Sequence, residues 1–562
     1  MEKVWLKNYE PGVPHNITYP RIPLHGFLEE AAAKYPETTA TIFPGRFGDD
    51  TRLSYRQLNE LSNRLANAFL DMGVAKGDRV ALLLPNCPQF VIAYYAALKA
   101  GATVVASNPL YSPRELEFQL KDAGAQTIVV LSVFYRKVAE LRERAGLKNI
   151  IVTSIKEHLP FVTRTLFTLA REKKEGHRVS IAGDRYARLL SGILARYPAQ
   201  PPPVKVEADD VALFQYTGGT TGTPKAAVAT HFNLVANTLQ LKAWRPDMKV
   251  AGEITLGVMP MFHVYGMLTV LSLSVCVASP MVLLPRFEIE HVLKAIDKYH
   301  PTVFPGVPTM YVAINNYPGV GKYNLRSIRA CISGAAPLPL EVQQRFEELT
   351  GARLSEGYGL SESPTATHCN PLHGLRKTGT IGLPMPDVEA KIVDLESGEK
   401  EMPTGEPGEL VIRGPQVMKG YWNRPEETAR ALRGGWLYTG DIAKVDQDGF
   451  FSIVDRKKEM IIAGGYNIYP REIEEVLYEH PKVKEAVAIG IRDPYRGETV
   501  KGFIVLKEGE TATEEEIISF CQANLARYKV PRFIEFRKEL PKTVVGKVLR
   551  RVLIEEERAK QK

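Results

Sequence analysis

The chain has 562 residues, of which 44% are hydrophobic and 24% charged, the balance of a folded globular protein rather than a disordered or fibrous one. Lysine and arginine (72) exceed aspartate and glutamate (64) by 8. This excess is too small for the concentrated basic surface of a nucleic-acid-binding protein, but it is compatible with small anionic substrates. At roughly 100 to 200 residues per domain, two or more domains are expected.

The cysteines favour a reducing compartment. They are scattered and odd in number, so neither a disulfide framework nor a CxxC metal pair is expected from Cys87, Cys276, Cys331, Cys369 and Cys521. The first twelve residues are polar and mixed in charge, unlike a secretory signal. We therefore expect a cytoplasmic protein.

Short apolar runs alternate with amphipathic helical segments in the first part of the chain. The runs at 80–84, 127–131 and 150–152 are bounded by glycine, proline or charge, which predicts parallel strands with crossover helices. One such helix is predicted at 54–72, where Leu58, Leu61, Leu65, Ala68 and Phe69 share a face. An α/β architecture follows.

Residues 254–285 contain no Asp, Glu, Lys or Arg and are long enough to span a bilayer. Pro260, His263, Gly266 and Pro280 interrupt this stretch, however. We therefore predict a buried strand, loop and helix of a large α/β core.

The composition of the chain changes at two further places. A proline-rich segment at 199–203 is predicted to be a surface connection inside a domain. Beyond about residue 455, charged helices (471–479, 514–525) alternate with short strands (486–491, 502–506), which predicts a separate, smaller α+β domain.

The strongest local motif is FQYTGGTTGTPK at 214–225, directly after the apolar run 211–213. Its glycines let backbone N–H groups turn inward, while its hydroxyls and Lys225 can hold a polyphosphate. A Walker-type P-loop needs Gly-Lys-Ser/Thr at its end, and here Pro224 precedes the lysine. The motif predicts another kind of phosphate loop, with a plain glycine-rich surface turn as the alternative.

This loop resembles that of the adenylate-forming enzymes, the superfamily of acyl-CoA synthetases, luciferases and peptide-synthetase adenylation domains. Gly218 and Ala226 depart from the family's usual Ser and Gly. The runs SGAAP at 333–337 and EGYGLSE at 356–362 resemble the family's adenine-binding segments. The resemblance implies that ATP is bound by Thr217, Gly218, Gly219, Thr220, Thr221, Gly222, Lys225, Gly334, Ala335, Ala336, Glu356, Gly357, Tyr358, Gly359 and Ser361.

Two carboxylates gain roles from the same resemblance. Glu362 is implied as a hard oxygen ligand for Mg²⁺ on the phosphates, with the Thr217 hydroxyl as a second contact. Asp441 follows a glycine turn and is implied as the ribose ligand, with Arg456 beside it. Taken alone, Glu362 would be a solvated charge and Asp441 a turn residue.

Lys547 matches the family's catalytic lysine, a mobile cation that meets the charge developing on the α-phosphate. The resemblance places a hinge at Lys458 and, after rotation about it, turns Ala463, Gly464 and Gly465 toward CoA. By itself such a lysine would be solvent-exposed.

The segment around His263 resembles the family segment whose histidine lies near the substrate carboxylate. A satisfied core histidine is the alternative reading, and a proton-transfer role is left open.

The resemblance covers nearly the whole chain and is most like a bacterial long-chain fatty acid–CoA ligase. It implies an α/β multidomain fold: a large N-terminal domain (1–455) of stacked α/β sheets with a distorted β-barrel, and a small mobile α+β C-terminal domain (456–562). The implied reaction forms acyl-AMP from ATP and a long- or medium-chain fatty acid, then transfers the acyl group to CoA. Another adenylate-former, acting on aryl acids or a carrier protein, is the near alternative, and a non-catalytic nucleotide-binding protein the distant one.

Residues 158–174 resemble an insertion typical of those ligases. Leu159, Val162, Leu166 and Leu169 share a helical face, and Arg164, Arg171, Lys173 and Lys174 supply positive charge. Such a helix can lie on an anionic membrane or pack on its own domain, and both readings stay open. Peripheral attachment to the inner face of the membrane and a homodimer are therefore left open beside a free monomer.

Overall fold

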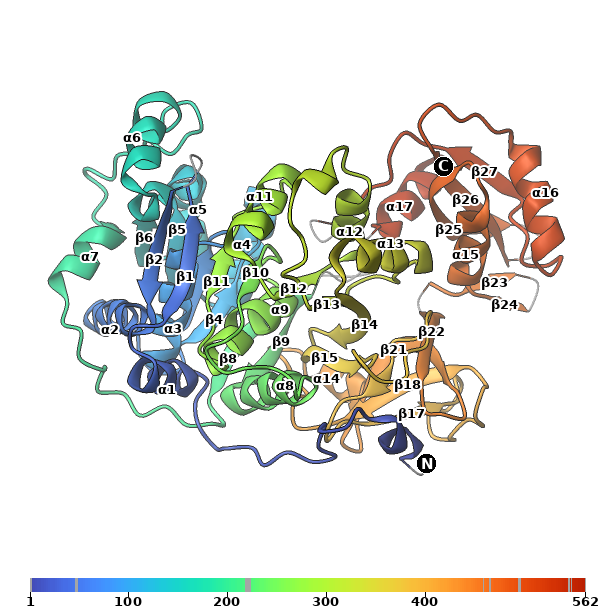
Figure 1. Cartoon of the computed structure of the whole chain (residues 1–562), viewed down its shortest axis with the longest axis horizontal. Coiled ribbons are helices and arrows are strands. Elements are labelled where there is room, and N and C mark those ends of the chain that lie inside the picture. Colours follow the sequence, from blue (N-terminus) through green and yellow to red (C-terminus); the bar gives the residue numbers. More distant parts are fainter. Residues whose placement is uncertain are drawn as a thin grey trace.

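The computed structural model describes residues 3–45, 49–217, 224–457, 459–463, 466–493, 497–543, 546 and 548–560. Over these ranges the strands form a small sheet at one end of the molecule and a larger body of three sheets (Figure 1). The mixed α/β architecture expected from the sequence is confirmed.

The first sheet has the strand order β19-β9-β8-β4-β3-β5-β6-β7, parallel from β8 to β7 and antiparallel at β8/β9 and β9/β19. The predicted strands are confirmed as β3 (Arg79–Leu83), β5 (Thr127–Leu131) and β6 (Asn149–Thr153). The remaining strands are β4 (Thr103–Ala106), β7 (Ala187–Leu189), β8 (Val211–Thr217), β9 (Lys225–Thr230) and β19 (Gly420–Tyr421).

Helices accompany this sheet as crossover connections. The predicted one is α2 (Tyr55–Asp71), which begins because the Ser54 hydroxyl accepts the Gln57 N–H and the Gln57 side chain accepts the Ser54 N–H. The others are α1 (Gly26–Lys34), α3 (Pro88–Lys99), α4 (Pro113–Ala123), α5 (Tyr135–Ala145), α6 (Phe161–Ala170) and α7 (Leu190–Arg196).

The second sheet has the order β16-β15-β14-β13-β12-β10-β11-β1-β2. Its strands are β1 (Thr39–Pro44), β2 (Asp50–Ser54), β10 (Thr255–Gly257), β11 (Met281–Leu283), β12 (Val303–Gly306), β13 (Ala330–Ser333), β14 (Arg353–Leu360), β15 (Ser363–Cys369) and β16 (Leu383–Pro384). Its helices are α8 (His231–Ala243), α11 (Ile289–Tyr299), α12 (Pro308–Asn315) and α13 (Leu340–Thr350).

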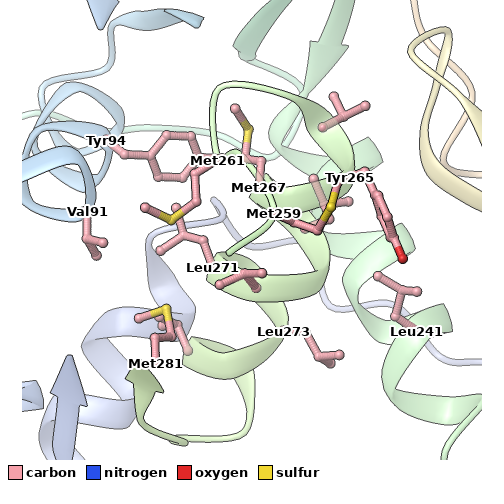
Figure 2. Close-up of a cluster of buried hydrophobic side chains, with 14 of the residues drawn as sticks. Val91, Tyr94, Leu241, Met259, Met261, Tyr265, Met267, Leu271, Leu273 and Met281 are labelled. Atoms are coloured by element: carbon pink, nitrogen blue, oxygen red, sulfur yellow. The ribbon is translucent and has the colours of Figure 1, made fainter. Parts of the chain in front are cut away.

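The uncharged stretch 254–285 forms β10, the turn α9 (Val264–Gly266), the π-helical η4 (Met267–Ser272), α10 (Leu273–Cys276) and β11. This confirms the predicted core placement. Met259, Met261, Met267 and Met281 are fully buried here and pack with Tyr94 and Leu271 (Figure 2). Among the described helices, none is both long and apolar enough to cross a membrane.

A third, antiparallel sheet runs β17-β18-β21-β20, with β22 on β21. Its elements are β17 (Glu389–Val393), β18 (Gly408–Arg413), α14 (Pro425–Ala431), β20 (Leu432–Arg433), β21 (Trp436–Val445) and β22 (Phe451–Arg456). The strand order shows that the expected distorted barrel is an open sheet over the residues described.

The small sheet has the order β24-β23-β26-β25, with β27 on β26. It comprises β23 (Ile461–Ala463), β24 (Tyr466–Ile468), α15 (Pro470–Glu479), β25 (Val483–Asp493), β26 (Gly497–Leu506), α16 (Glu514–Asn524), β27 (Phe533–Phe536) and α17 (Arg550–Lys560). It has hydrophobic clusters of its own, as an independently folding unit requires.

An N-terminal strap, residues 3–24, crosses the larger body. It begins with the turn η1 (Val4–Asn8), where buried Trp5 packs edge-on against Phe451 and the Asn8 amide donates to the Asp448 carbonyl at 2.7 Å. Near its end the Leu24 N–H donates to His231 Nδ1 at 3.1 Å, at the start of α8. The strap therefore ties the third sheet to the rest of the body.

Candidate active site

Of the two segments that resemble adenine-binding sequences, 333–337 begins at the end of β13 and 356–362 lies largely in β14, and these two strands are adjacent and parallel. Ala335 has a φ of 68°, and a Cβ added at Gly359 would lie 1.4 Å from the Thr365 carbonyl oxygen, so only glycine fits there. Gly334 lies against the Tyr265 ring, 3.3 Å from an added Cβ to Cζ, while Ala336, Gly357 and Ser361 complete the segments. The small residues of these segments thus let neighbouring parts of the protein pack closely against the backbone.

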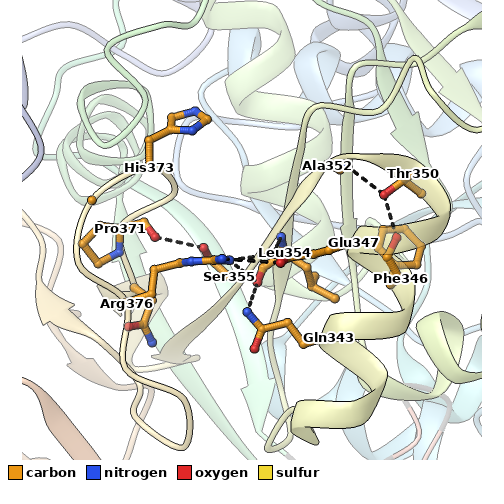
Figure 3. A network of polar contacts seen from close by, with 12 residues as sticks. Gln343, Phe346, Glu347, Thr350, Ala352, Leu354, Ser355, Pro371, His373 and Arg376 are labelled. Atoms are coloured by element: carbon orange, nitrogen blue, oxygen red, sulfur yellow. Dashed lines mark hydrogen bonds and ion pairs between the residues drawn. The ribbon is translucent and has the colours of Figure 1, made fainter.

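A polar network behind β14 fixes its position (Figure 3). The Gln343 amide donates to the Leu354 carbonyl at 3.0 Å, and the Ser355 hydroxyl donates to the Pro371 carbonyl at 3.1 Å. Arg376 pairs with Glu347 at 2.6 Å, joining the loop after β15 to α13. These bonds hold the strand that carries Glu356 to Leu360.

Tyr358, Asp441 and Arg456 form one cluster. The Tyr358 hydroxyl donates to Asp441 Oδ2 at 2.5 Å, and Arg456 Nε lies 3.2 Å from Oδ1. Strand pairing places Asp441 opposite Arg456, so the β21/β22 register dictates this contact. Asp441 is only 3% exposed, and its negative charge is the first cause of the raised pKa of Arg456. Tyr358 and Arg456 therefore hold the Asp441 side chain from both of its oxygens.

Glu362, Tyr421 and Lys225 form a second cluster. Glu362 lies in the turn between β14 and β15, and its Oε1 accepts the Tyr421 hydroxyl at 2.8 Å. The Lys225 ammonium lies 4.7 Å from the Tyr421 ring centroid. The charge of Glu362 also raises the pKa of Arg456, which shows that the two clusters are neighbours.

Thr217 and Lys225 face each other across β8/β9, and the Thr217 hydroxyl donates to the Lys225 carbonyl at 3.4 Å. Both ends of the phosphate-loop motif therefore lie beside the second cluster. Gly218, Gly219, Thr220, Thr221 and Gly222 lie outside the described residues, as do Lys458, Gly464, Gly465 and Lys547.

His263 is half-buried at the start of α9, and its Nδ1 accepts the Tyr265 N–H at 3.2 Å. The Thr365 hydroxyl, close to Glu362 in the chain, donates to the Val264 carbonyl at 2.6 Å, and Met261 N–H donates to Asn86 at 2.8 Å. The neighbours of His263 in the chain are thus bonded to β15 on one side and to Asn86 on the other.

The chain around residue 458 is anchored differently on its two sides. Lys457 pairs with Glu409 of the third sheet at 2.9 Å, and its N–H donates to the Gly440 carbonyl. Glu459 instead pairs with Arg550 of the small domain, which also binds Glu474 at 2.6 Å. Ala463, on β23, is buried and pairs with Gly497.

The small domain contacts the larger body at two further places. The Arg471 N–H donates to Asp455 Oδ2 at 2.8 Å. Gly546, at a φ of 77°, lies against α12: a Cβ added there would be 2.9 Å from the Thr309 hydroxyl. The loop that carries Lys547 in the sequence therefore meets the larger body at Gly546.

The sequence did not indicate Tyr421 or Arg471 as residues of the site. Tyr421 binds a residue 59 positions away, and Arg471 acts on Glu356 from another domain. No local motif marks either one, because both contacts depend on how distant strands and domains meet.

Burial raises the pKa of Glu356 to about 7, against which Arg471 and the Leu338 N–H act. A raised pKa means that the fold favours the protonated form. The stability contributed by Glu356 is then complete below about pH 4.5 and is lost as the pH rises through about 7. We expect Glu356→Gln, which stays neutral, to gain about 1 kcal/mol, or roughly 2 °C in Tm, relative to wild type between pH 5 and pH 8.

Thermal unfolding at the two pH values measures this gain. Glu348→Gln, on the exposed side of α13, is the matched control and should show the same offset from wild type at both pH values. A pH-independent offset for Glu356→Gln would contradict the titration of Glu356 in this range.

The chain matches known proteins over most of its length. Residues 28–422 match the model of the family "AMP-binding enzyme", and residues 472–547 match "AMP-binding enzyme C-terminal domain". The chain is 47% identical to the long-chain-fatty-acid–CoA ligase of Bacillus subtilis (strain 168), over 99% of this chain and 98% of that protein. It is similar to the crystal structure of ATP-bound MatB from Rhodopseudomonas palustris, with a TM-score of 0.83 at 28% identity, covering 96% of this chain and 100% of that one. The apo form of MatB superposes with a TM-score of 0.72 at the same identity and coverage.

Proposed function

Because the chain belongs to the AMP-binding enzyme family, we propose that it ligates a long- or medium-chain fatty acid to CoA through an acyl-AMP intermediate. The overall reaction cleaves ATP to AMP and pyrophosphate. The observation that carries this proposal is 47% identity over nearly the full length to a long-chain-fatty-acid–CoA ligase, combined with the paired clusters around Asp441 and Glu362.

In the first step the fatty carboxylate attacks the α-phosphate of ATP and pyrophosphate leaves. Asp441 accepts the ribose hydroxyls, and the Tyr358 ring, held by its bond to Asp441, lies against the adenine. Lys225 and the 218–222 loop hold the phosphates, and Lys547 stabilises the charge that develops during attack. His263 borders the reacting carboxylate, and the buried methionines beyond it can adapt to an alkyl chain.

The donor set suits Mg²⁺ carried by the nucleotide. Within the described residues no group of three His, Cys, Asp or Glu side chains could hold a metal ion alone, so phosphate oxygens would supply most ligands. Glu362, whose other contact is the Tyr421 hydroxyl, would provide a carboxylate oxygen and Thr217 a hydroxyl. The ion would neutralise phosphate charge there.

In the second step the small domain (456–562) rotates about residue 458. The anchoring of Lys457 on the third sheet and of Glu459 on Arg550 supports a pivot between them. Rotation withdraws Lys547 and turns Ala463, Gly464 and Gly465 toward the acyl-AMP. The CoA thiol then attacks the acyl carbonyl, AMP leaves, and the thioester is formed.

We expect Glu362→Gln to raise the Mg²⁺ concentration needed for half-maximal adenylate formation by about tenfold or more, because one charged oxygen ligand is lost. ATP–pyrophosphate exchange titrated with Mg²⁺ measures this. Glu426→Gln, an exposed carboxylate on α14, is the matched control and should leave the titration unchanged. An unshifted midpoint for Glu362→Gln would remove Glu362 from the metal site.

Product formation with CoA across saturated acids from short to long, with aromatic acids alongside, tests the proposed function. The expected result is acyl-CoA from medium and long fatty acids and no comparable product from aromatic acids. A preference for aromatic acids would indicate an aryl-CoA ligase, and exchange without any CoA product would indicate transfer to a carrier protein.

A further inference from the structure

The segment 418–421, which ends in strand β19, holds Glu362 at two points. The Met418 N–H donates to the Glu362 carbonyl at 2.8 Å, and the Tyr421 hydroxyl donates to Glu362 Oε1 at 2.8 Å. The other carboxylate oxygen, Oε2, accepts no hydrogen bond from the residues that the structure describes. Glu362 therefore has its backbone and one oxygen fixed, while its second oxygen is open to a ligand.

Tyr421 is itself held in place by its surroundings. Its strand pairs with β9, and the Tyr421 N–H donates to the Thr428 hydroxyl at 2.9 Å. The next residue, Trp422, donates its backbone N–H to the Ala226 carbonyl at 2.9 Å and its indole N–H to the Asp122 carbonyl at 3.1 Å. Because the backbone around it is bonded in this way, the Tyr421 hydroxyl can fix the position of its partner.

The ring of Tyr421 makes a second contact, with Lys225. The Lys225 ammonium lies 4.7 Å from the ring centroid, within the range at which the face of an aromatic ring attracts a cation. Lys225 also lies opposite Thr217 across β8/β9, at the end of the phosphate-loop motif. One tyrosine thus holds a cation with its ring and an anion with its hydroxyl.

Tyr421 also keeps these two charges apart. In the part of the chain that the structure describes, no ion pair joins Lys225 to Glu362, although both contact the same side chain. The neighbouring cluster shows the alternative, because Arg456 lies 3.2 Å from Asp441 and the two charges offset each other. A direct pair between Lys225 and Glu362 would likewise leave less charge of either sign for a ligand.

We infer that Tyr421 is a positioning residue of the nucleotide site, whose hydroxyl orients Glu362 for Mg²⁺ and whose ring keeps Lys225 available to the phosphates. This inference rests on the proposed function, in which Glu362 and Lys225 receive ATP and its metal ion. The hydroxyl and the ring serve different parts of the ligand, so two substitutions separate their effects. Tyr421→Phe removes the hydroxyl alone, and Tyr421→Leu removes the ring as well.

Isothermal titration of the full-length protein with α,β-methylene-ATP, in Mg²⁺ and in EDTA, tests the hydroxyl. The Mg²⁺ advantage, defined as the Kd in EDTA divided by the Kd in Mg²⁺, should fall about tenfold in Tyr421→Phe, because partners that orient metal ligands contribute at least that much to metal affinity. The Kd in EDTA should stay close to that of wild type, because the ring remains. Tyr135→Phe is the matched control: it removes a similar bond, from the Tyr135 hydroxyl to Asp184 at 2.7 Å, and should change neither value.

Tyr421→Leu tests the ring. Without the aromatic face, the Kd in EDTA should rise about fivefold, since Lys225 loses the group that holds it and can pair with Glu362 instead. Tyr186→Leu is the matched control, because it removes a ring whose centroid lies 3.9 Å from the Arg142 guanidinium. It should bind the analogue like wild type.

A double-mutant cycle separates positioning from a general structural role. In the Glu362→Ala background, Tyr421→Phe should leave the Mg²⁺ advantage unchanged, because the carboxylate that the hydroxyl orients is absent. Three results would each overturn the inference: an equal rise of the Kd with and without Mg²⁺ in Tyr421→Phe, an effect that adds to that of Glu362→Ala, or a wild type without any Mg²⁺ advantage. Failure of the wild type to ligate any acid to CoA would refute the proposed function, and the titrations with the analogue would still decide the role of Tyr421.

Discussion

Lys547→Ala is expected to slow acyl-AMP formation by about 10²- to 10³-fold, while conversion of supplied acyl-AMP to acyl-CoA stays close to the wild-type rate. The reason is that a preorganised cation at the α-phosphate is worth about that factor in the step where charge develops there. The neighbouring Gly546 lies against Thr309 of the larger body. ATP–pyrophosphate exchange and a thioester assay with synthetic acyl-AMP measure the two half-reactions separately.

Lys542→Ala is the matched control for this variant. Lys542 belongs to the same loop but pairs with Glu485 inside the small domain at 2.7 Å, so its loss should change neither half-reaction strongly. Equal losses in both half-reactions for Lys547→Ala would mean that the lysine supports the domain rather than the adenylation step.

For Asp441→Ala we expect ATP binding to weaken by about 10- to 100-fold, since a hydrogen bond to a charged group contributes about 1.5–3 kcal/mol. The substitution also releases the Tyr358 hydroxyl and leaves the Arg456 guanidinium without its partner. Isothermal titration with ATP and the KM for ATP in the exchange reaction measure the effect. Affinity for CoA should not change, because the proposed CoA-facing residues lie in the small domain.

Asp446→Ala provides the comparison, because Asp446 lies five residues on, at the end of β21, and pairs with Lys377 at 2.5 Å away from the Asp441 cluster. It should bind ATP like wild type. Unchanged ATP affinity in Asp441→Ala would exclude this carboxylate from the ribose site.

Much of the fold could be predicted because its signals are local. The apolar runs that became β3, β5 and β6, and the spacing of Leu58, Leu61 and Leu65 in α2, are properties of consecutive residues. The third sheet was harder to foresee. Its shape depends on which strands meet at its edges, and that is decided by the whole chain.

The site divides in the same way. Asp441 and Arg456 could be paired from their motifs, and strand register does bring them together. The partners of Glu362 and Glu356 could not, since Tyr421 reaches Glu362 from the first sheet and Arg471 acts on Glu356 from helix α15 of the small domain. Helix α6 lies between these cases. Its amphipathic pattern could be predicted from the sequence, but the side that faces water is decided by the contacts that Thr163 and Phe167 make in the folded chain.

The N-terminal strap also sets an order of events during synthesis. Its contact between Asn8 and Asp448 joins residues 440 positions apart, so the strap is synthesised long before the segment on which it packs. At about 5–20 residues per second, Trp5 waits on the order of tens of seconds for the Phe451 ring that covers it. Until then the indole of Trp5 lacks this cover, and in a variant with Trp5 as its single tryptophan the fluorescence would report when the third sheet is complete.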